Sequence, residues 1–223
     1  NDEYFLTSGD KVRIFWEETA FENDFVNTND KSKLINKIGH AIHDLVPSFE
    51  KLSYDTKIGD ICKDLGMKKP LISQSMYIFK QPKIGSEVRP HQDGTFLYTE
   101  PQSVIGFWWA LDDCREENGC LWVVKGSHKE GVKQRFKRCG DVNSGCEFVP
   151  KENIVWDISA AEKLAVSAGT LVILHNAVVH FSKHNASSKS RHAYSIHVTD
   201  GADGVEYLSD NWLQREDGFH PIE

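Results

Sequence analysis

A histidine and an aspartate stand two positions apart at His91 and Asp93, in the stretch RPHQDGTF. In an extended chain, residues i and i+2 project from the same face, so both side chains can reach one metal ion. Two protein ligands do not usually hold a catalytic metal, and His-x-Asp pairs are common on protein surfaces. The pair therefore calls for a third ligand elsewhere in the chain.

The candidates for a third ligand are the histidines of the second strand-rich region: His175, His180, His184, His192 and His197. Four other histidines are discounted. His40 and His43 are explained by packing or exposure on a helix, His128 by a turn, and His220 by its place in the C-terminal tail. His180 stands out because Ser182 shares its face by alternation. Arg191 then starts the returning strand, and its planar guanidinium suits bidentate binding of a carboxylate.

Together, His91, Asp93 and His180 make a 2-His-1-carboxylate set, with Arg191 positioned to bind an anion beside it. Such a facial triad leaves coordination positions open and is typical of non-haem Fe(II) oxygenases, where a chelating 2-oxo acid and O₂ can bind. Two alternatives stay open. One is a cupin-like zinc enzyme that activates water for hydrolysis; the other is a non-catalytic binding protein of the same fold.

Composition limits the partners and the compartment. Lys+Arg 26 against Asp+Glu 33 gives a net charge of −7, which argues against a nucleic-acid or anionic-membrane binder. Five cysteines without a C-x-x-C pair favour a reducing compartment and argue against a structural zinc site. We therefore expect an intracellular, cytoplasmic protein. The chain begins with Asn1, so we expect native N-terminal residues to be missing, which leaves any targeting signal there open.

The elements that must position these residues are helices first and strands afterwards. The 223 residues suit a single domain over 1–223. Two short strands are expected around Gly9-Asp10, a helix within 31–52 that Pro47 ends, and a helix over 57–65. Strand patterns follow at 71–80, 95–98, 104–111, 120–124, 164–166, 171–174, 178–182 and 193–199. This order favours a mainly-β, α+β chain with a sandwich or jelly-roll core.

The uncharged segment 164–182 approaches the length of a membrane span. Its Gly169-Thr170 break, its His175-Asn176 pair and its β-branched residues indicate two buried strands around a turn instead. We expect no membrane span in the chain.

Several stretches match one known family in order: SGDKVRIFWE, INKIGHA, QSMYIFKQP, EVRPHQDGTFLYTEP, ENGCLWVVKGSH, GTLVILHNAVVHFSKHN, SRHAYSIHV and NWLQ. From near residue 4 to about residue 214, the chain resembles the phytanoyl-CoA dioxygenase (PhyH) family of Fe(II)/2-oxoglutarate oxygenases. Within it, the animal-type phytanoyl-CoA dioxygenase domain-containing proteins look most similar. The resemblance implies a double-stranded β-helix, a jelly-roll barrel with helices packed outside. The family usually has further helical sequence upstream of this chain.

Carried over residue by residue, the resemblance implies that His91, Asp93 and His180 ligate iron. It implies that Arg191 binds the far carboxylate of 2-oxoglutarate with help from Ser182. The remaining positions implied to contact the cosubstrate are Trp108 (or Trp109, if the alignment shifts by one), Lys37 and Met76. For the last two, a solvent-facing helix lysine and a core methionine are the alternatives. We interpret ENGCLWVVKGSH as structural, with Trp122 facing the substrate as the alternative.

The implied reaction is hydroxylation of a C–H bond coupled to conversion of 2-oxoglutarate and O₂ into succinate and CO₂, with ascorbate as a possible stimulant. Related iron halogenases replace the carboxylate ligand, so the retained Asp93 favours hydroxylation. The prime substrate is expected to be a small molecule, with a lipid or acyl-CoA as candidates, and the protein to be a monomer. A basic segment, 125–138, is a candidate contact for an anionic substrate, although a solvated loop is the favoured interpretation.

Overall fold

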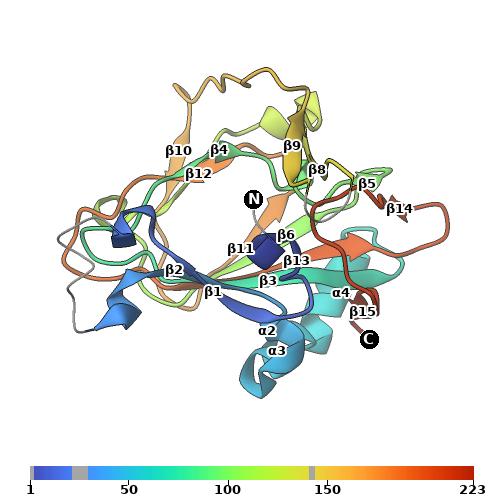
Figure 1. Ribbon diagram of the computed structural model, residues 1–223, viewed down its shortest axis with the longest axis horizontal. Helices are drawn as coiled ribbons and strands as arrows, with labels where there is room; N and C mark the ends of the chain where they lie inside the picture. The colour runs from blue at the N-terminus through green and yellow to red at the C-terminus, as the bar shows by residue number, and fades with distance from the viewer. Residues whose placement is uncertain (1–2, 22–29, 141–143) are drawn as a thin grey trace.

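Two antiparallel sheets face each other across the interior of the protein (Figure 1). The computed structural model describes residues 3–21, 30–140 and 144–223. The larger sheet has the order β1 (Val12–Trp16), β2 (Ile35–His40), β3 (Pro70–Ile78), β13 (Ala193–Asp200), β6 (Ile105–Ala110) and β11 (Leu171–His175), and β15 (His220–Pro221) also pairs with β3. The smaller sheet has the order β10 (Glu162–Leu164), β7 (Leu121–Val123), β12 (His180–Ser182) and β4 (Val88–His91).

Two further strand pairs lie beside these sheets. β5 (Thr99–Glu100) pairs with β14 (Glu206–Tyr207), and β8 (Arg135–Arg138) pairs with β9 (Cys146–Val149). The chain is therefore mainly β, with antiparallel pairing and few helices, as the sequence predicts.

Short helices cover the side of the larger sheet that faces away from the smaller one (Figure 1). They are α2 (Ile42–Leu45), α3 (Pro47–Ser53) and α4 (Thr56–Asp64), and α1 (Glu3–Leu6) lies near the N-terminus. Their apolar residues pack on alternate residues of the sheet, including Phe107, Tyr194 and Ile196. Because successive strand residues point to opposite faces, Ser195 and His197 of β13 are left facing the interior between the sheets.

Several predicted elements are confirmed. The predicted helix over 57–65 is α4, and strands lie within or next to most of the predicted stretches. Within 164–182, β11 and β12 are separated by a turn, as expected. In the described part of the chain, no helix is long and apolar enough to cross a membrane.

Three predicted elements are wrong. The proposed helix within 31–52 is interrupted by β2, because Lys37 and Gly39 pair with Ile78 and Met76 of β3. Long-range backbone pairing here overrides a helical spacing of apolar residues, which is a weak local signal. The first of the two N-terminal strands is α1, and the strand expected at 95–98 is replaced by a 3₁₀ turn over Asp93–Thr95 and a bend.

Candidate active site

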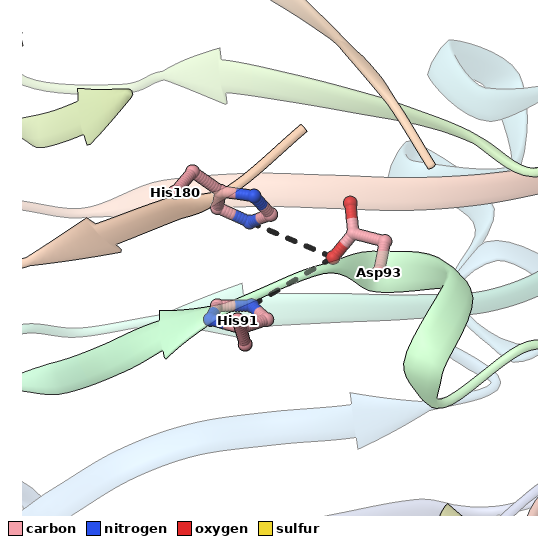
Figure 2. A group of neighbouring side chains, drawn as sticks. All are labelled: His91, Asp93 and His180. Carbon is pink, nitrogen blue, oxygen red and sulfur yellow. Dashed lines mark ion pairs between the residues drawn. The ribbon is translucent and has the colours of Figure 1, made fainter. Parts of the chain in front are cut away.

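His91 and His180 face each other across neighbouring strands. They are direct partners in the antiparallel pairing of β4 with β12, and their ring centroids lie 4.3 Å apart. Asp93 is the first residue of the 3₁₀ turn that follows β4, so the chain bends and returns its carboxylate toward both rings (Figure 2). Strand pairing thus joins the His-x-Asp pair to a residue far along the chain.

The three side chains leave their ligand atoms directed at one another. Nδ1 of His91 lies 2.8 Å from the carbonyl oxygen of Arg89, and Nδ1 of His180 lies 3.1 Å from that of Val178. Each Nδ1–H therefore donates to the backbone, which leaves each Nε2 free as a metal ligand. These Nε2 atoms lie 3.8 and 3.6 Å from Oδ1 of Asp93, too far for hydrogen bonds. All three ligand atoms lie within 4.8 Å of one another.

The protonation states also suit a cation. Burial lowers the pKa of His91 to about 4, and the neighbouring His180 adds to this effect. Burial alone would raise the pKa of Asp93, but His197 and His180 more than offset it and hold that pKa well below its usual range. A neutral imidazole and an ionised carboxylate are the forms that bind metals.

His197 is a part of this site that the sequence analysis weighed only as a possible ligand. Its Nε2 lies 3.3 Å from Oδ2 of Asp93, and its Nδ1 lies 3.2 Å from the amide nitrogen of Gln74. The Gln74 amide donates to Nδ1, which places the ring proton on Nε2, facing the carboxylate. Gly106 makes room for this contact, because a Cβ there would meet Oδ2 of Asp93 at 2.9 Å. The available signal was the alternation of polar Ser195 and His197 along an otherwise apolar strand.

A cavity of about 940 Å³ between the two sheets contains this group at its wall. It extends toward Arg191 in one direction. In the other it is lined largely by aromatic side chains: Phe5, Phe96, Phe148, Trp156 and Trp212. Such a concave site with few polar groups among apolar walls is typical of small-molecule binding.

Arg191 lies at the polar end of the cavity with 2% of its surface exposed. Its Nη2 donates to the carbonyl of Gly119 at 3.0 Å, whereas Nε and Nη1 have no hydrogen-bond partner among the described residues. Its guanidinium carbon lies 5.3 Å from the centre of the Trp108 ring. A buried guanidinium with two unpaired donors is costly unless an anion binds it.

The other residues expected near the cosubstrate also line the cavity: Lys37, Met76, Trp108 and Ser182. Trp109 instead faces the helices, where it stacks on Tyr194 with centroids 5.7 Å apart. Lys37 projects from β2 and not from a helix surface, and burial lowers its pKa. The structure therefore brings all the predicted site residues to one cavity and distinguishes between the two tryptophans.

Trp122 does not face the cavity, and most cations of the basic segment 125–138 are already paired. Trp122 points outward, stacked on Phe181 and covered by the ammonium of Lys183. In the segment 125–138, most cations have local acceptors. Ion pairs with acidic residues hold Lys125, Lys133, Arg135 and Lys137, and backbone carbonyls hold Arg138. The interpretation of the whole segment as a solvated loop is wrong for its second half, because Arg135–Arg138 form β8, paired with β9, and Gln134 lines the cavity.

The fold and the group of two histidines and a carboxylate define a class of mainly-β proteins with a candidate metal site between two sheets. The sequence profile of the family described as Phytanoyl-CoA dioxygenase (PhyH) matches residues 2–193. Phytanoyl-CoA dioxygenase of Arabidopsis thaliana is 45% identical over 221 residues, covering 99% of this chain and 76% of that protein. Phytanoyl-CoA dioxygenase domain-containing protein 1 of Bos taurus is 46% identical over 215 residues, covering 95% and 73%. The chain belongs to the phytanoyl-CoA dioxygenase (PhyH) family.

Solved structures share the fold at low sequence identity. The non-heme alpha ketoglutarate dependent carbocyclase SnoK from nogalamycin biosynthesis is 21% identical with a TM-score of 0.67, over 85% of this chain and 77% of that one. EctD from S. alaskensis, solved with 2-oxoglutarate and 5-hydroxyectoine, is 19% identical with a TM-score of 0.60, over 82% and 62%. At this identity the likeness shows the architecture alone.

Proposed function

We propose that this protein is an Fe(II)- and 2-oxoglutarate-dependent dioxygenase that hydroxylates a C–H bond of a small-molecule substrate. One observation carries the proposal: a group of two histidines and a carboxylate, with Asp93 and His180 buried and His91 partly exposed, shares a cavity with a buried arginine that has unpaired donors. The first feature suits a metal and the second suits a carboxylate ligand. We also propose that residues 1–223 form one domain, and that the two sheets are the halves of a double-stranded β-helix.

The residues present fit ferrous iron. His91 and His180 would each supply Nε2 and Asp93 would supply Oδ1, the mixed nitrogen and oxygen set of a facial triad. Nε2 of His197 lies 3.3 Å from the second carboxylate oxygen and faces it. Bound together, iron, 2-oxoglutarate and O₂ supply oxidative decarboxylation to succinate and CO₂ coupled to hydroxylation of the substrate.

The chain's own residues orient the cosubstrate and limit what can reach the metal. Arg191 would bind the carboxylate of 2-oxoglutarate farther from the metal, with Ser182 beside it. Trp108 and Met76 supply apolar wall of the same cavity, and Lys37 adds a basic group from β2. Ascorbate would act only by keeping the iron reduced.

The aromatic part of the cavity suits an apolar portion of the prime substrate. A lipid or acyl group satisfies that condition, because its hydrocarbon is buried by Phe96, Phe148 and Trp156 without leaving polar atoms unpaired. We propose a small molecule of this kind as the substrate. We also propose that the protein is monomeric and cytoplasmic.

The test is an assay for succinate in the absence of any prime substrate. Protein is purified anaerobically, supplied with Fe(II) and 2-oxoglutarate, and then exposed to air. We expect slow, iron-dependent succinate formation that zinc does not support. Zinc-supported ester or amide hydrolysis without succinate would point to a metallohydrolase instead, and binding of 2-oxoglutarate without turnover of any screened substrate would point to a binding protein.

A further inference from the structure

A second buried cation lies beside Arg191. Lys80 follows β3, and its carbonyl oxygen accepts a hydrogen bond from the backbone N–H of Arg191 at 3.2 Å, so the two residues are neighbours across the extension of the β3–β13 pair. Like Arg191, Lys80 lines the cavity and is 2% exposed. The two side chains therefore bring two positive charges to the same polar end.

Lys80 is held by neutral oxygens alone. Its ammonium donates to the carbonyl of Ser86 at 2.6 Å and to Oγ of Ser182 at 2.9 Å. Within residues 30–140 and the other described ranges, it has no ion pair. The carboxylates of Glu17 and Glu87 raise the pKa of Lys80, but by less than burial and Arg191 lower it. Oε2 of Glu17 accepts hydrogen bonds from Asn36 and Ser86.

Two neighbouring buried cations that form no ion pair with a carboxylate among the described residues are electrostatically unfavourable. Burial lowers the pKa of Lys80 to about 7, and the charge of Arg191 lowers it further in the same direction. An anion at this end of the cavity would stabilise both charges at once. Ser182 was expected to assist the cosubstrate, and its hydroxyl oxygen accepts a hydrogen bond from the Lys80 ammonium.

Gly119 contacts both Lys80 and Arg191. A Cβ at this position would lie 2.5 Å from Cε of Lys80 and 2.7 Å from the carbonyl oxygen of Lys183, and the backbone has φ +79. A side chain here would therefore displace the lysine stem. The carbonyl of the same glycine is the acceptor for Nη2 of Arg191. The Asn118-Gly119 turn, which we interpret from sequence as structural, thus shapes the anion end of the cavity.

We propose that Lys80 is a second cation of the 2-oxoglutarate site, placed by Gly119 and Ser182 to bind the same remote carboxylate as Arg191. This inference rests on the proposed function and adds a residue that determines cosubstrate specificity. It predicts that Lys80 discriminates between oxo acids with and without a terminal carboxylate.

The experiment compares how substitution of Lys80 changes the binding of two oxo acids. Binding of 2-oxoglutarate and of 2-oxopentanoate, which lacks the terminal carboxylate, is measured by titration calorimetry on protein loaded with Co(II) in place of iron. The variants are Lys80→Met, Lys80→Gln and the control Lys83→Met, an exposed lysine three positions along the chain. Lys80→Gln keeps an amide donor for Ser86 and Ser182 and serves if Lys80→Met does not fold.

We expect both Lys80 variants to lower the affinity for 2-oxoglutarate by about tenfold or more, because a charge-assisted contact is lost. The affinity for 2-oxopentanoate should fall by less than about twofold. Lys83→Met should change neither. Equal weakening of both ligands, or no weakening of either in a folded variant, would overturn the role of Lys80 while wild-type binding of 2-oxoglutarate still stands. Wild-type protein that binds neither ligand would overturn the proposed function together with this inference.

Discussion

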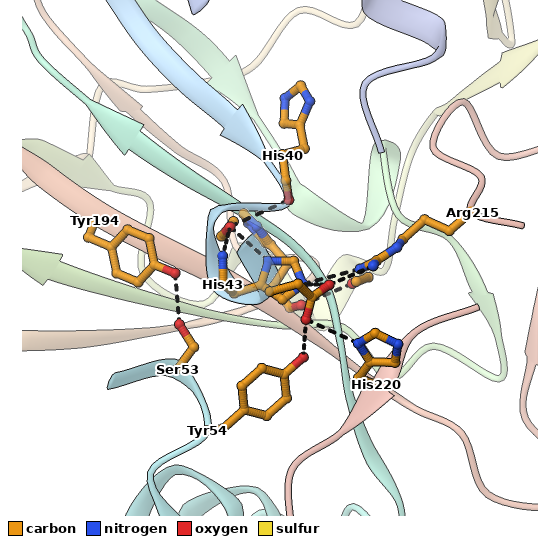
Figure 3. A network of polar contacts seen from close by, with 11 residues as sticks. His40, His43, Ser53, Tyr54, Tyr194, Arg215 and His220 are labelled. Atoms are coloured by element: carbon orange, nitrogen blue, oxygen red, sulfur yellow. Dashed lines mark hydrogen bonds and ion pairs between the residues drawn. The ribbon is translucent and has the colours of Figure 1, made fainter. Parts of the chain in front are cut away.

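Two buried carboxylates in this protein are surrounded by histidines, and they differ in how completely they are paired. Asp44 lies 2.6 Å from the hydroxyl of Tyr54, 2.5 Å from Nη2 of Arg215 and 3.1 Å from Nδ1 of His220. Figure 3 shows the side chains of Tyr54, Arg215 and His220 directed toward this one carboxylate. His43 completes the cluster with its Nε2 3.3 Å away. These contacts fasten the C-terminal segment to α2 and α3, so the Asp44 cluster is a structural network.

Asp93 has one close neighbour, His197, and two longer approaches from the Nε2 atoms of His91 and His180. Each of these two rings is fixed by a hydrogen bond from its Nδ1 to a backbone carbonyl. The rings therefore do not rotate to bring Nε2 within hydrogen-bond distance of the carboxylate. The comparison shows that composition alone does not identify a metal site. What distinguishes Asp93 is that its histidine neighbours keep unpaired ligand atoms aimed at a shared point.

The largest effect is expected from removal of a metal ligand. His180→Ala or Asp93→Ala should lower iron-dependent succinate formation by more than about 100-fold, since a facial triad needs all three ligands. Thermal unfolding of the metal-free protein should change little, because these residues are not paired as Asp44 is. A variant that kept turnover would remove that residue from the metal site.

The reverse pattern is expected for Asp44→Ala. Arg215 has 6% of its side chain exposed and would be left as a buried, unpaired charge, which costs about 3–5 kcal/mol. Urea unfolding measures this loss, and succinate formation per folded molecule should stay at the wild-type value. Full stability with lost turnover would mean that the two clusters have been assigned the wrong way round.

The structural network should also make stability depend on pH. Burial lowers the pKa of His43 to about 4 from an ordinary value of 6.5, so between these values the unfolded chain binds a proton that the folded protein does not. The contribution is complete above pH 6.5 and is lost as the pH falls toward 4. From pH 7 to pH 5 we expect His43 to contribute a loss of about 2 kcal/mol to the free energy of unfolding, in addition to any loss from the other buried histidines. His43→Gln should flatten this dependence, and an unchanged slope would contradict the assignment to His43.

At the other end of the cavity, Arg191→Ala should mainly raise the requirement for 2-oxoglutarate. Loss of a charge-assisted bidentate contact corresponds to about 1.5–3 kcal/mol, or roughly 10- to 150-fold in affinity. The measurement is the concentration dependence of succinate formation, with Fe(II) affinity as the control that should be unchanged. Wild-type affinity for the cosubstrate in this variant would show that Arg191 does not bind its carboxylate.

The smallest effect is expected from His197→Gln, which changes the support of Asp93 but no ligand. Neighbours that orient a metal ligand typically contribute about 10- to 100-fold in metal affinity. Competition with a fluorescent chelator, using Co(II), measures this loss. If affinity were unchanged, Asp93 would be positioned by its 3₁₀ turn alone.

The grouping of His91, Asp93 and His180 was predictable because each lies in a local pattern that carries its geometry. His91 and Asp93 are two apart on an extended segment, and His180 shares a strand face with Ser182. The β2 strand was not predictable in this way, because Ile35–His40 is extended only through pairing with β1 and β3. Lys80 and Gly119 were missed for the same reason. Their contact joins segments that nothing in either local sequence connects.

The most direct test of the central claim is visible absorption spectroscopy of the anaerobic protein. Adding Fe(II) and then 2-oxoglutarate should produce a charge-transfer band that iron alone does not give, since the cosubstrate chelates the metal through its oxo acid group. We predict this band in wild-type protein and in folded Asp44→Ala, and its loss in His180→Ala. Absence of the band in wild-type protein, or an undiminished band in His180→Ala, would contradict a metal centre built on His91, Asp93 and His180.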